Sequence, residues 1–257
     1  MATITVFQRH EKKFLMEESV MRRLLPEIRK HMEVDEHCLN GKTYPIANLY
    51  YDTDHDDVIR DSLQKPFYKE KLRMRSYGIP ESDRSRVFLE IKKKVDGVVT
   101  KRRARLTYIE AKRFLDRRIY PKTDDYMTMQ VLREIDYYLS HKEVHATTRI
   151  SYDRYAFFDK EDKSFRLTFD QNIYYLKAEK GKKIDFQDRR KGYRVIPDHL
   201  RLMEVKVSNA YPLWFVKLLE DDGVQPVSFS KYGVSYKNEL LHRIDGNTEY
   251  INVLSHI

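Results

Sequence analysis

Cations at every second position are the feature that most restricts how this 257-residue chain can fold. Residues 68–78, YKEKLRMRSYG, place Lys69, Lys71, Arg73 and Arg75 two residues apart. Successive side chains of a β-strand point to opposite faces, so in a strand all four cations share one face. Like charges at this spacing repel one another. The pattern therefore predicts an anion in front of the strand.

The segment that follows, RVFLEIKKKVDGVVTKRRARL (86–106), predicts a β-hairpin with the same alternation. Asp96-Gly97 suits a two-residue type I′ turn, in which both residues need a positive φ. With Val95 opposite Val98, one face of the hairpin is apolar and the other is charged. The charged face carries Glu90, Lys92, Lys94, Lys101, Arg103 and Arg105.

Similar alternation recurs in FRLTFD (165–170) and EVKVS (204–208). A lone charged hairpin face could simply be solvated. Several strands that share one apolar and one charged face favour a closed antiparallel β-barrel, or tunnel, with a polar, basic lumen. Helices predicted from apolar spacing pack outside it, over about 17–32, 107–118, 124–142, 209–221 and 232–242. The predicted fold class is α+β, in a single domain over 1–257.

Composition restricts the function further. The net charge is +9, and such a cationic excess points to polyanionic ligands: nucleic acid, anionic membrane or phosphates. The one cysteine, Cys38, excludes an internal disulfide and a cysteine-cluster metal site. We see neither the apolar core of a signal peptide nor an apolar run near the roughly 18 residues of a membrane helix. A cytoplasmic protein is therefore expected.

Three predicted strands contain a glutamate two residues before a lysine, so that both side chains share a face: Glu11/Lys13, Glu90/Lys92 and Glu204/Lys206. One such pair is a weak signal, because Glu and Lys often neighbour each other by chance. Several pairs in one lumen suit phosphoryl transfer, in which a carboxylate holds a divalent metal and cations hold phosphate oxygens. The chain lacks a P-loop, a G-x-G-x-x-G, an H-E-x-x-H and a G-x-S-x-G motif, which disfavours the corresponding enzyme classes.

The ordered motifs resemble the VTC domain, the catalytic domain of the vacuolar transporter chaperone complex, in its stand-alone bacterial form. That domain is one of the triphosphate tunnel metalloenzymes, with CYTH phosphatases and RNA triphosphatases. The matching segments span nearly the whole chain: EKKFLM (11–16), YPIANLYYDT (44–53), KLRMRSYG (71–78), VFLEIKKK (87–94), KRRARL (101–106), TRISYDRYAFF (148–158), FRLTFDQNI (165–173), LMEVKV (202–207) and VSFSKYGVSY (227–236).

The resemblance implies an antiparallel β-tunnel that makes polyphosphate. VTC domains transfer the γ-phosphate of ATP to a growing polyphosphate chain with a divalent metal, so the expected partners are ATP and inorganic polyphosphate. The expected metal is Mn²⁺, with Mg²⁺ as the alternative. No specific nucleic-acid partner is expected. With no membrane segment expected in the chain, any membrane association requires a separate membrane protein.

The resemblance also assigns residues. The catalytic, phosphate-binding set is Lys13, Arg73, Arg75, Lys92, Arg103, Arg154 and Arg166. Further substrate contacts are assigned to Lys101, Lys206, Ser230 and Lys231, and the metal to Glu204. The family's second basic position before FSKY is Ser228 in this chain, which weakens one expected phosphate contact.

Three questions stay open at this level. A hydrolase in the same fold would use the same cations and metal but admit water, and would cleave tripolyphosphate, a nucleoside triphosphate or an RNA 5′-triphosphate. A non-catalytic polyphosphate-binding module would bind without turnover. In addition, Arg149 and Arg154 have opposite parity, so both can face the lumen only if a β-bulge intervenes.

Overall fold

The computed structural model describes residues 10–96, 98–208 and 210–245 and is built around one large antiparallel sheet. Its strands are β1 (His10–Glu17), β2 (Met32–Val34), β3 (Tyr44–Asp52), β4 (Tyr68–Tyr77), β5 (Arg86–Val95), β6 (Val98–Thr107), β7 (His145–Asp159), β8 (Arg166–Lys177), β9 (Tyr193–Arg194), β10 (Leu200–Val207) and β11 (Pro226–Val227). The strand order is β11-β1-β10-β8-β7-β3-β4-β5-β6, with β2 and β9 added beside β7 and β8.

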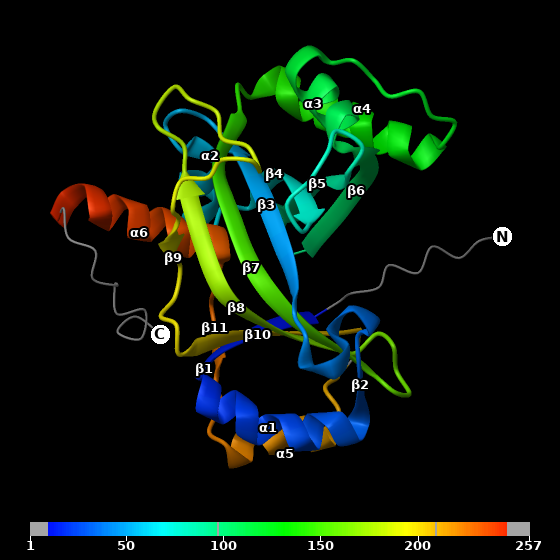
Figure 1. Ribbon diagram of the computed structural model, residues 1–257, viewed down its shortest axis with the longest axis vertical. Helices are drawn as coiled ribbons and strands as arrows, with labels where there is room; N and C mark the ends of the chain where they lie inside the picture. The colour runs from blue at the N-terminus through cyan, green and yellow to red at the C-terminus, as the bar shows by residue number, and fades with distance from the viewer. Residues whose placement is uncertain (1–9, 97, 209, 246–257) are drawn as a thin grey trace.

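Helices pack on both faces of this sheet (Figure 1). They are α1 (Glu18–His31), the 3₁₀ segment η1 (Glu36–Gly41), α2 (Asp57–Leu63), α3 (Tyr108–Arg117), α4 (Tyr126–His141), α5 (Leu213–Asp221) and α6 (Lys231–Asp245). The pair α3 and α4 packs on β5 and β6, α1 and α5 pack at the β1 and β10 end, and α6 packs near β8. The five longer helices that apolar spacing predicted are all present, and Pro26 does not interrupt α1.

Alternation along each strand separates an outer apolar face, under α1, α3, α4 and α5, from an inner face. The inner face is charged in one part and apolar in another, where Ile59 of α2 and Tyr232 of α6 pack with Ile46 and Ile150. Val87, Leu89 and Ile91 on β5 are at most 1% exposed and pack beneath α3 and α4. The residues between them point to the other side. Thr107 then ends β6 and begins α3, because it forms a reciprocal capping box with Glu110. The strand pattern and the cap thus place the hairpin and its covering helix together.

The register predicted for the 86–106 hairpin is confirmed. Val95 lies opposite Val98, and Glu90 lies opposite Arg103. Gly97 of the predicted turn lies outside the described residues. Among the described residues, no helix combines the length and the apolar character needed to cross a membrane.

The predicted closed barrel is not confirmed, because the sheet is open. Within the described ranges, the strand order ends at β11 on one side and at β6 on the other. β11 has two residues, and Pro226 has no N–H to donate to a further strand. The β6 edge exposes Lys101, Arg103 and Arg105, and charged edges oppose strand pairing. The sheet is nevertheless curled. Glu11 on β1 and Lys92 on β5 belong to strands far apart in the strand order, yet they are close enough for their charges to interact.

Candidate active site

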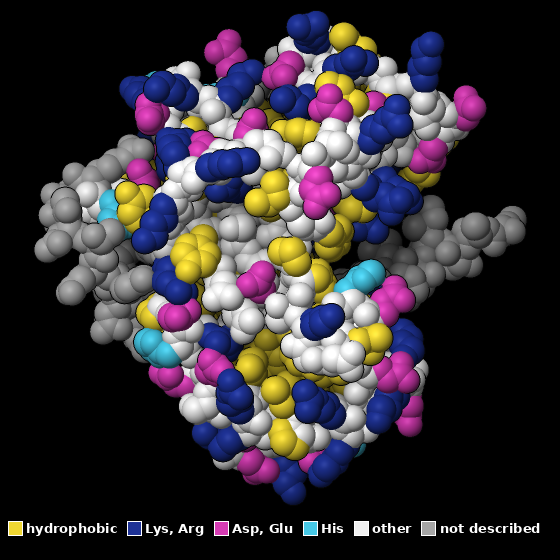
Figure 2. All heavy atoms as spheres, viewed as in Figure 1, with side chains coloured by type: hydrophobic (Ala, Val, Ile, Leu, Met, Phe, Trp, Pro, Cys, Tyr) yellow, Lys and Arg dark blue, Asp and Glu magenta, His cyan; other side chains and the backbone are white. Residues whose placement is uncertain are grey.

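The inner face of the curled sheet surrounds a cleft of about 2390 Å³. Residues from β1, β5, β6, β7, β8 and β10 line it. The predicted site residues among its lining are Lys92, Lys101, Arg103, Arg154, Arg166, Glu204 and Lys206. By contrast, Figure 2 shows basic and acidic side chains mixed over the outer surface of the molecule in that view. These predicted site residues therefore converge inside the curled sheet, whereas that outer view shows no patch of a single charge.

One side of the cleft is strongly basic. The inward positions of β4, β5 and β6 form two cross-strand rows, Lys71–Lys92–Lys101 and Arg73–Glu90–Arg103. Arg75 follows Arg73 on the same face of β4. We call this set the basic wall: Lys71, Arg73, Arg75, Lys92, Lys101 and Arg103, with Glu90 among them. Lys92, Lys101 and Arg103 line the cleft, and the other members lie beside them on the same face of the sheet.

Glu90 orients part of the basic wall. It is 1% exposed, its Oε2 accepts a 2.6 Å hydrogen bond from Arg73 Nε, and its Oε1 lies 2.5 Å from Lys101 Nζ. Burial opposes ionisation of Glu90, but Arg73, Arg75 and Lys101 outweigh it and lower its pKa to about 2. Arg75 in turn donates to Asn48 Oδ1 at 2.9 Å. These contacts fix where the two arginines can point.

Other inward cations have no such partner. Within the described residues, no carboxylate oxygen lies within 4.0 Å of a side-chain nitrogen of Lys71, Lys92, Arg103 or Arg166. Desolvation, with Lys69, Lys92 and Lys13 nearby, lowers the pKa of Lys71 to about 8. Desolvation likewise lowers the pKa of Lys92. Partly desolvated, unpaired cations are a ready binding surface for a polyanion.

The opposite side of the cleft contains a buried ion cluster made of Arg154, Asp170, Glu204 and Lys231. Asp170 is 0% exposed and accepts two hydrogen bonds from Arg154, at 2.7 Å and 2.8 Å. Lys231 Nζ lies 2.5 Å from Asp170 Oδ2 and 2.6 Å from Glu204 Oε1. Arg154 Nη2 also donates to Glu204 Oε2 at 3.3 Å. Burial opposes ionisation of Glu204, but Lys231, Lys13 and Arg154 hold its pKa well below the usual range.

The remaining predicted residues lie next to this cluster. Lys13 Nζ donates to the carbonyl oxygen of Phe229 at 2.9 Å and lies 3.4 Å from Glu11 Oε1. Ser230 Oγ accepts the N–H of Gly233 at 3.2 Å and so caps the start of α6. Lys231, the first residue of α6, is only 9% exposed and contacts carboxylates rather than the open cleft. Lys206, on β10, lies 3.5 Å from Glu11 Oε2.

The sequence does not predict the role of Asp170, the last residue of FRLTFD (165–170), which pairs with both cations of the ion cluster. The structure also answers the parity question of Arg149 and Arg154. Arg149 does not share the cleft with Arg154, because its guanidinium donates to the carbonyl oxygen of Phe186 at 3.1 Å. The strand pair β7 and β8 does contain an irregularity between Ser151 and Asp153, with Asn172 of β8 at φ 50°. The extra residue of this β-bulge is therefore in β8, and Arg149 points away from the cleft.

A divalent metal needs oxygen ligands, and two carboxylates are available in the cleft. Glu11 and Glu204 are diagonal neighbours on adjacent strands, and both line the cleft. Within the described part of the chain, no group of three or more His, Cys, Asp or Glu side chains is arranged to hold a metal. Mg²⁺ and similar ions are often held by one or two carboxylates together with substrate phosphates. Glu11 and Glu204 therefore suit a metal that is also bound by substrate phosphates, and not a metal site made of protein ligands alone.

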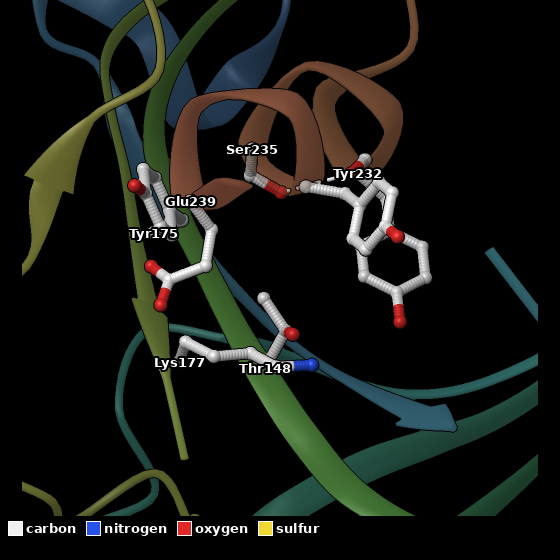
Figure 3. Close-up of a pocket in the computed structure, with 7 residues that line it drawn as sticks. Thr148, Tyr175, Lys177, Tyr232, Ser235 and Glu239 are labelled. Carbon is white, nitrogen blue, oxygen red and sulfur yellow. Dashed lines mark hydrogen bonds between the residues drawn. The ribbon is translucent and has the colours of Figure 1, made fainter. Parts of the chain in front are cut away.

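A second cavity, between α6 and strands β7 and β8, is too small to be a substrate site. It has a volume of about 10 Å³, which is room for one water at most. Figure 3 shows Tyr232 and Ser235 of α6 facing Thr148 and Lys177 across it. Tyr232 also donates to the buried Asp52 at 2.7 Å. This cavity belongs to the packing of α6 on the sheet.

A curled antiparallel sheet with inward cations and carboxylates is the architecture of a triphosphate-tunnel protein. The family model described as the VTC domain matches residues 8–239. The chain therefore belongs to the VTC domain family, within the triphosphate tunnel metalloenzymes, and members of that superfamily use divalent metals. Among curated proteins, no sequence matches this chain.

Among the solved structures that are similar to this chain, two illustrate the likeness. One, from Bacillus halodurans and provisionally named an adenylate cyclase, has 16% identity and a TM-score of 0.50, over 86% of this chain and 92% of that chain. The other, from Vibrio parahaemolyticus and given the same provisional name, has 9% identity and a TM-score of 0.42, over 89% and 97%. The first likeness supports the fold alone, and the second is too weak to carry an argument.

Proposed function

We propose that this chain is a polyphosphate polymerase that transfers the γ-phosphate of ATP to the end of an inorganic polyphosphate chain. The observation that supports the proposal best is the cleft itself, in which the basic wall faces the buried ion cluster. A triphosphate carries about four negative charges, and Lys71, Lys92, Arg103 and Arg166 have no carboxylate partner among the described charged pairs.

In this proposal the basic wall binds and orients the phosphates. Arg73 and Lys101, fixed by Glu90, present their remaining N–H groups to phosphate oxygens at set positions. The unpaired lysines and arginines neutralise charge as it moves toward the leaving group. Preorganised cations of this kind lower the barrier because they need not reorient during the reaction.

Glu204, with Glu11 beside it, would hold a divalent metal together with phosphate oxygens. When bound, the metal neutralises charge on the phosphates and polarises them. Family membership makes Mn²⁺ the first candidate and Mg²⁺ the second. The residues Lys231 and Arg154 hold Glu204 ionised in the meantime, so it needs no deprotonation before binding a metal.

The proposed reaction is an in-line displacement. An oxygen of the terminal phosphate of the acceptor attacks the γ-phosphorus of ATP, the bond from that phosphorus to the β–γ bridging oxygen breaks, and ADP leaves with the electron pair. The product is a polyphosphate longer by one unit. No covalent intermediate on the protein is required.

The family also supports a proposed cellular setting. We infer a cytoplasmic location, peripheral at the membrane through a separate membrane protein that receives the product. Co-purification of a membrane protein with the tagged chain from solubilised membranes would support that setting. Recovery of the chain only from the cytosolic fraction, without such a partner, would contradict it.

The direct test is to incubate the purified full chain with ATP and Mn²⁺ and to resolve the products by chain length on a gel. Polyphosphate much longer than three units, absent from Glu204→Gln and retained in the exposed-site control Glu143→Gln, would support the polymerase. Orthophosphate alone would indicate the hydrolase instead. Binding of tripolyphosphate without turnover would indicate a non-catalytic module.

A further inference from the structure

We propose that an aromatic cluster at the rim of the cleft, His37, Tyr44, Tyr77 and Phe88, is the binding platform for the nucleobase of the donor nucleotide. All four side chains line the cleft. The inference deepens the proposed function and rests on it, because it assigns the site to nucleoside triphosphates rather than to inorganic triphosphate.

The strand register brings these rings to the outer end of the basic wall. Along the inner face of β4, Lys71, Arg73 and Arg75 are followed by Tyr77. On β5 the inward residue opposite Arg75 is Phe88. Tyr77 and Phe88 therefore lie at the same end of the cleft, where Arg86 is the next inward residue of β5. Tyr44 of β3 adds a third ring, opposite Arg154 of β7.

The rings touch mainly through their edges. The centroids of Tyr77 and Phe88 are 5.8 Å apart with the rings at 90°, and those of Tyr44 and Tyr77 are 6.1 Å apart at 47°. His37 extends the row, 5.9 Å from Tyr44. Although it has two ring neighbours, Tyr77 is still 53% exposed. Edge contacts hold the rings in place while ring surface stays accessible.

Core packing does not account for Tyr77 and Phe88. In the described residues, the three apolar clusters beneath the helices include neither of them. Both lie on the charged face of the sheet, and Arg103 stacks its guanidinium 5.0 Å from the centre of the Phe88 ring. A phosphate gains little from an aromatic ring. A nucleobase stacked on one gains about 1–3 kcal/mol, largely without regard to base identity.

The spacing also fits a nucleotide. A strand advances about 3.3 Å per residue, so Tyr77 lies about 6–7 Å along β4 from Arg75. A base at Tyr77 therefore places the first phosphates near Arg75 and directs the γ-phosphate inward, toward Arg73 and Lys71. This orientation leaves the inner part of the cleft for the acceptor chain.

The test is calorimetric binding of three ligands to the full chain in EDTA, where metal-dependent turnover stops. The ligands are ATP, ribose 5′-triphosphate, which lacks only the base, and inorganic tripolyphosphate. Tyr77→Ala is expected to raise the Kd for ATP about 5- to 100-fold and to leave the other two within about twofold. Tyr77→Phe keeps the ring and is expected to bind ATP normally. Tyr126→Ala, which removes a 69% exposed tyrosine on α4, is the matched control.

Two results would overturn the platform while leaving the proposed function intact. One is an equal change in Kd for all three ligands in Tyr77→Ala, and the other is no change for ATP. Failure of the wild-type chain to bind inorganic tripolyphosphate would be a different result. It would refute the phosphate-binding site itself, and the platform with it.

Discussion

The two sides of the cleft treat charge in opposite ways. In the buried ion cluster, Arg154 and Lys231 meet Asp170 and Glu204, so cations and carboxylates balance and every charge has a close partner. In the basic wall, Glu90 is shared by Arg73 and Lys101, while Lys71 and Lys92 are left to repel one another. The ion cluster is paired within the fold, and of its two carboxylates only Glu204 also lines the cleft. The basic wall lacks carboxylate partners for Lys71 and Lys92, and a bound polyanion would supply the missing negative charge.

This difference separates structural from functional charge. A buried pair that loses one member leaves an uncompensated charge in a medium that cannot solvate it. An unpaired, crowded cation is already in an unfavourable environment, so its removal relieves repulsion. Substitution of the fully buried Asp170 should therefore affect folding first, and substitution of Lys71 or Lys92 should affect binding first. Glu204→Gln needs both readouts, because Glu204 belongs to the ion cluster and also lines the cleft.

The largest expected effect is on stability, in Asp170→Asn. This change removes the negative charge between Arg154 and Lys231, and we expect a loss of about 3–5 kcal/mol in the free energy of unfolding. Denaturant unfolding followed by circular dichroism measures it. The exposed-site control Asp61→Asn should change the free energy by less than about 0.5 kcal/mol. Equal stability of the two variants would mean that the ion cluster does not hold the fold together.

The next effect is on binding, in Lys92→Met. Loss of one charged hydrogen-bond donor to a phosphate, about 1.5–3 kcal/mol, should weaken binding of tripolyphosphate about 10- to 150-fold. The free energy of unfolding should stay the same or rise, because desolvation and nearby cations already lower the pKa of Lys92. Lys180→Met, at an exposed position, is the control. A destabilised Lys92→Met with unchanged binding would reverse the assignment of the basic wall.

The smallest effect is on pH dependence. Desolvation lowers the pKa of both Lys71 and Lys101 to about 8 in the free protein. A bound polyanion favours the charged lysines and raises these pKa values, so binding takes up protons once the pH exceeds about 8. ATP affinity in EDTA should thus be flat near pH 7 and fall roughly three- to tenfold by pH 8.5. Above about pH 8 the charge of ATP is nearly constant, since its last phosphate pKa is about 6–7.

Calorimetry in two buffers with different ionisation enthalpies would detect this proton uptake directly. In Lys71→Met the uptake should shrink, because one of the two titrating lysines is gone. An affinity that stays constant to pH 9, with no buffer dependence, would show that these lysines are charged in the free protein and do not respond to the ligand.

Local patterns in the sequence predicted the strands well. The alternation over 86–106 gave the correct register, because one apolar face must be buried and a slip of one residue would expose it. Closure of the sheet could not be read in the same way. It depends on whether the end strands can pair, and the two-residue β11 and the charged β6 edge leave the sheet open.

The site was likewise predictable only in part, because the sequence indicates the face of each side chain but not its contacts. The parity of the strands correctly placed Arg73, Lys92 and Arg103 on one inner face. Parity does not reveal partners, so Lys231 was expected to contact phosphate, although it lies between Asp170 and Glu204. Whether a cation stays available for a ligand depends on contacts between residues far apart in the chain. Those contacts follow from strand order and the placement of α6, which a single segment does not specify.

The central claim is that the two sides of the cleft have different functions: the basic wall binds phosphate, and Glu204 on the opposite side binds the metal. The most direct test is the affinity of the β,γ-imido analogue of ATP, with and without Mn²⁺, for the wild type, Lys92→Met and Glu204→Gln. We predict that Mn²⁺ strengthens binding to the wild type and to Lys92→Met, but not to Glu204→Gln. A Mn²⁺ effect that survives in Glu204→Gln, or that disappears in Lys92→Met, would contradict the account.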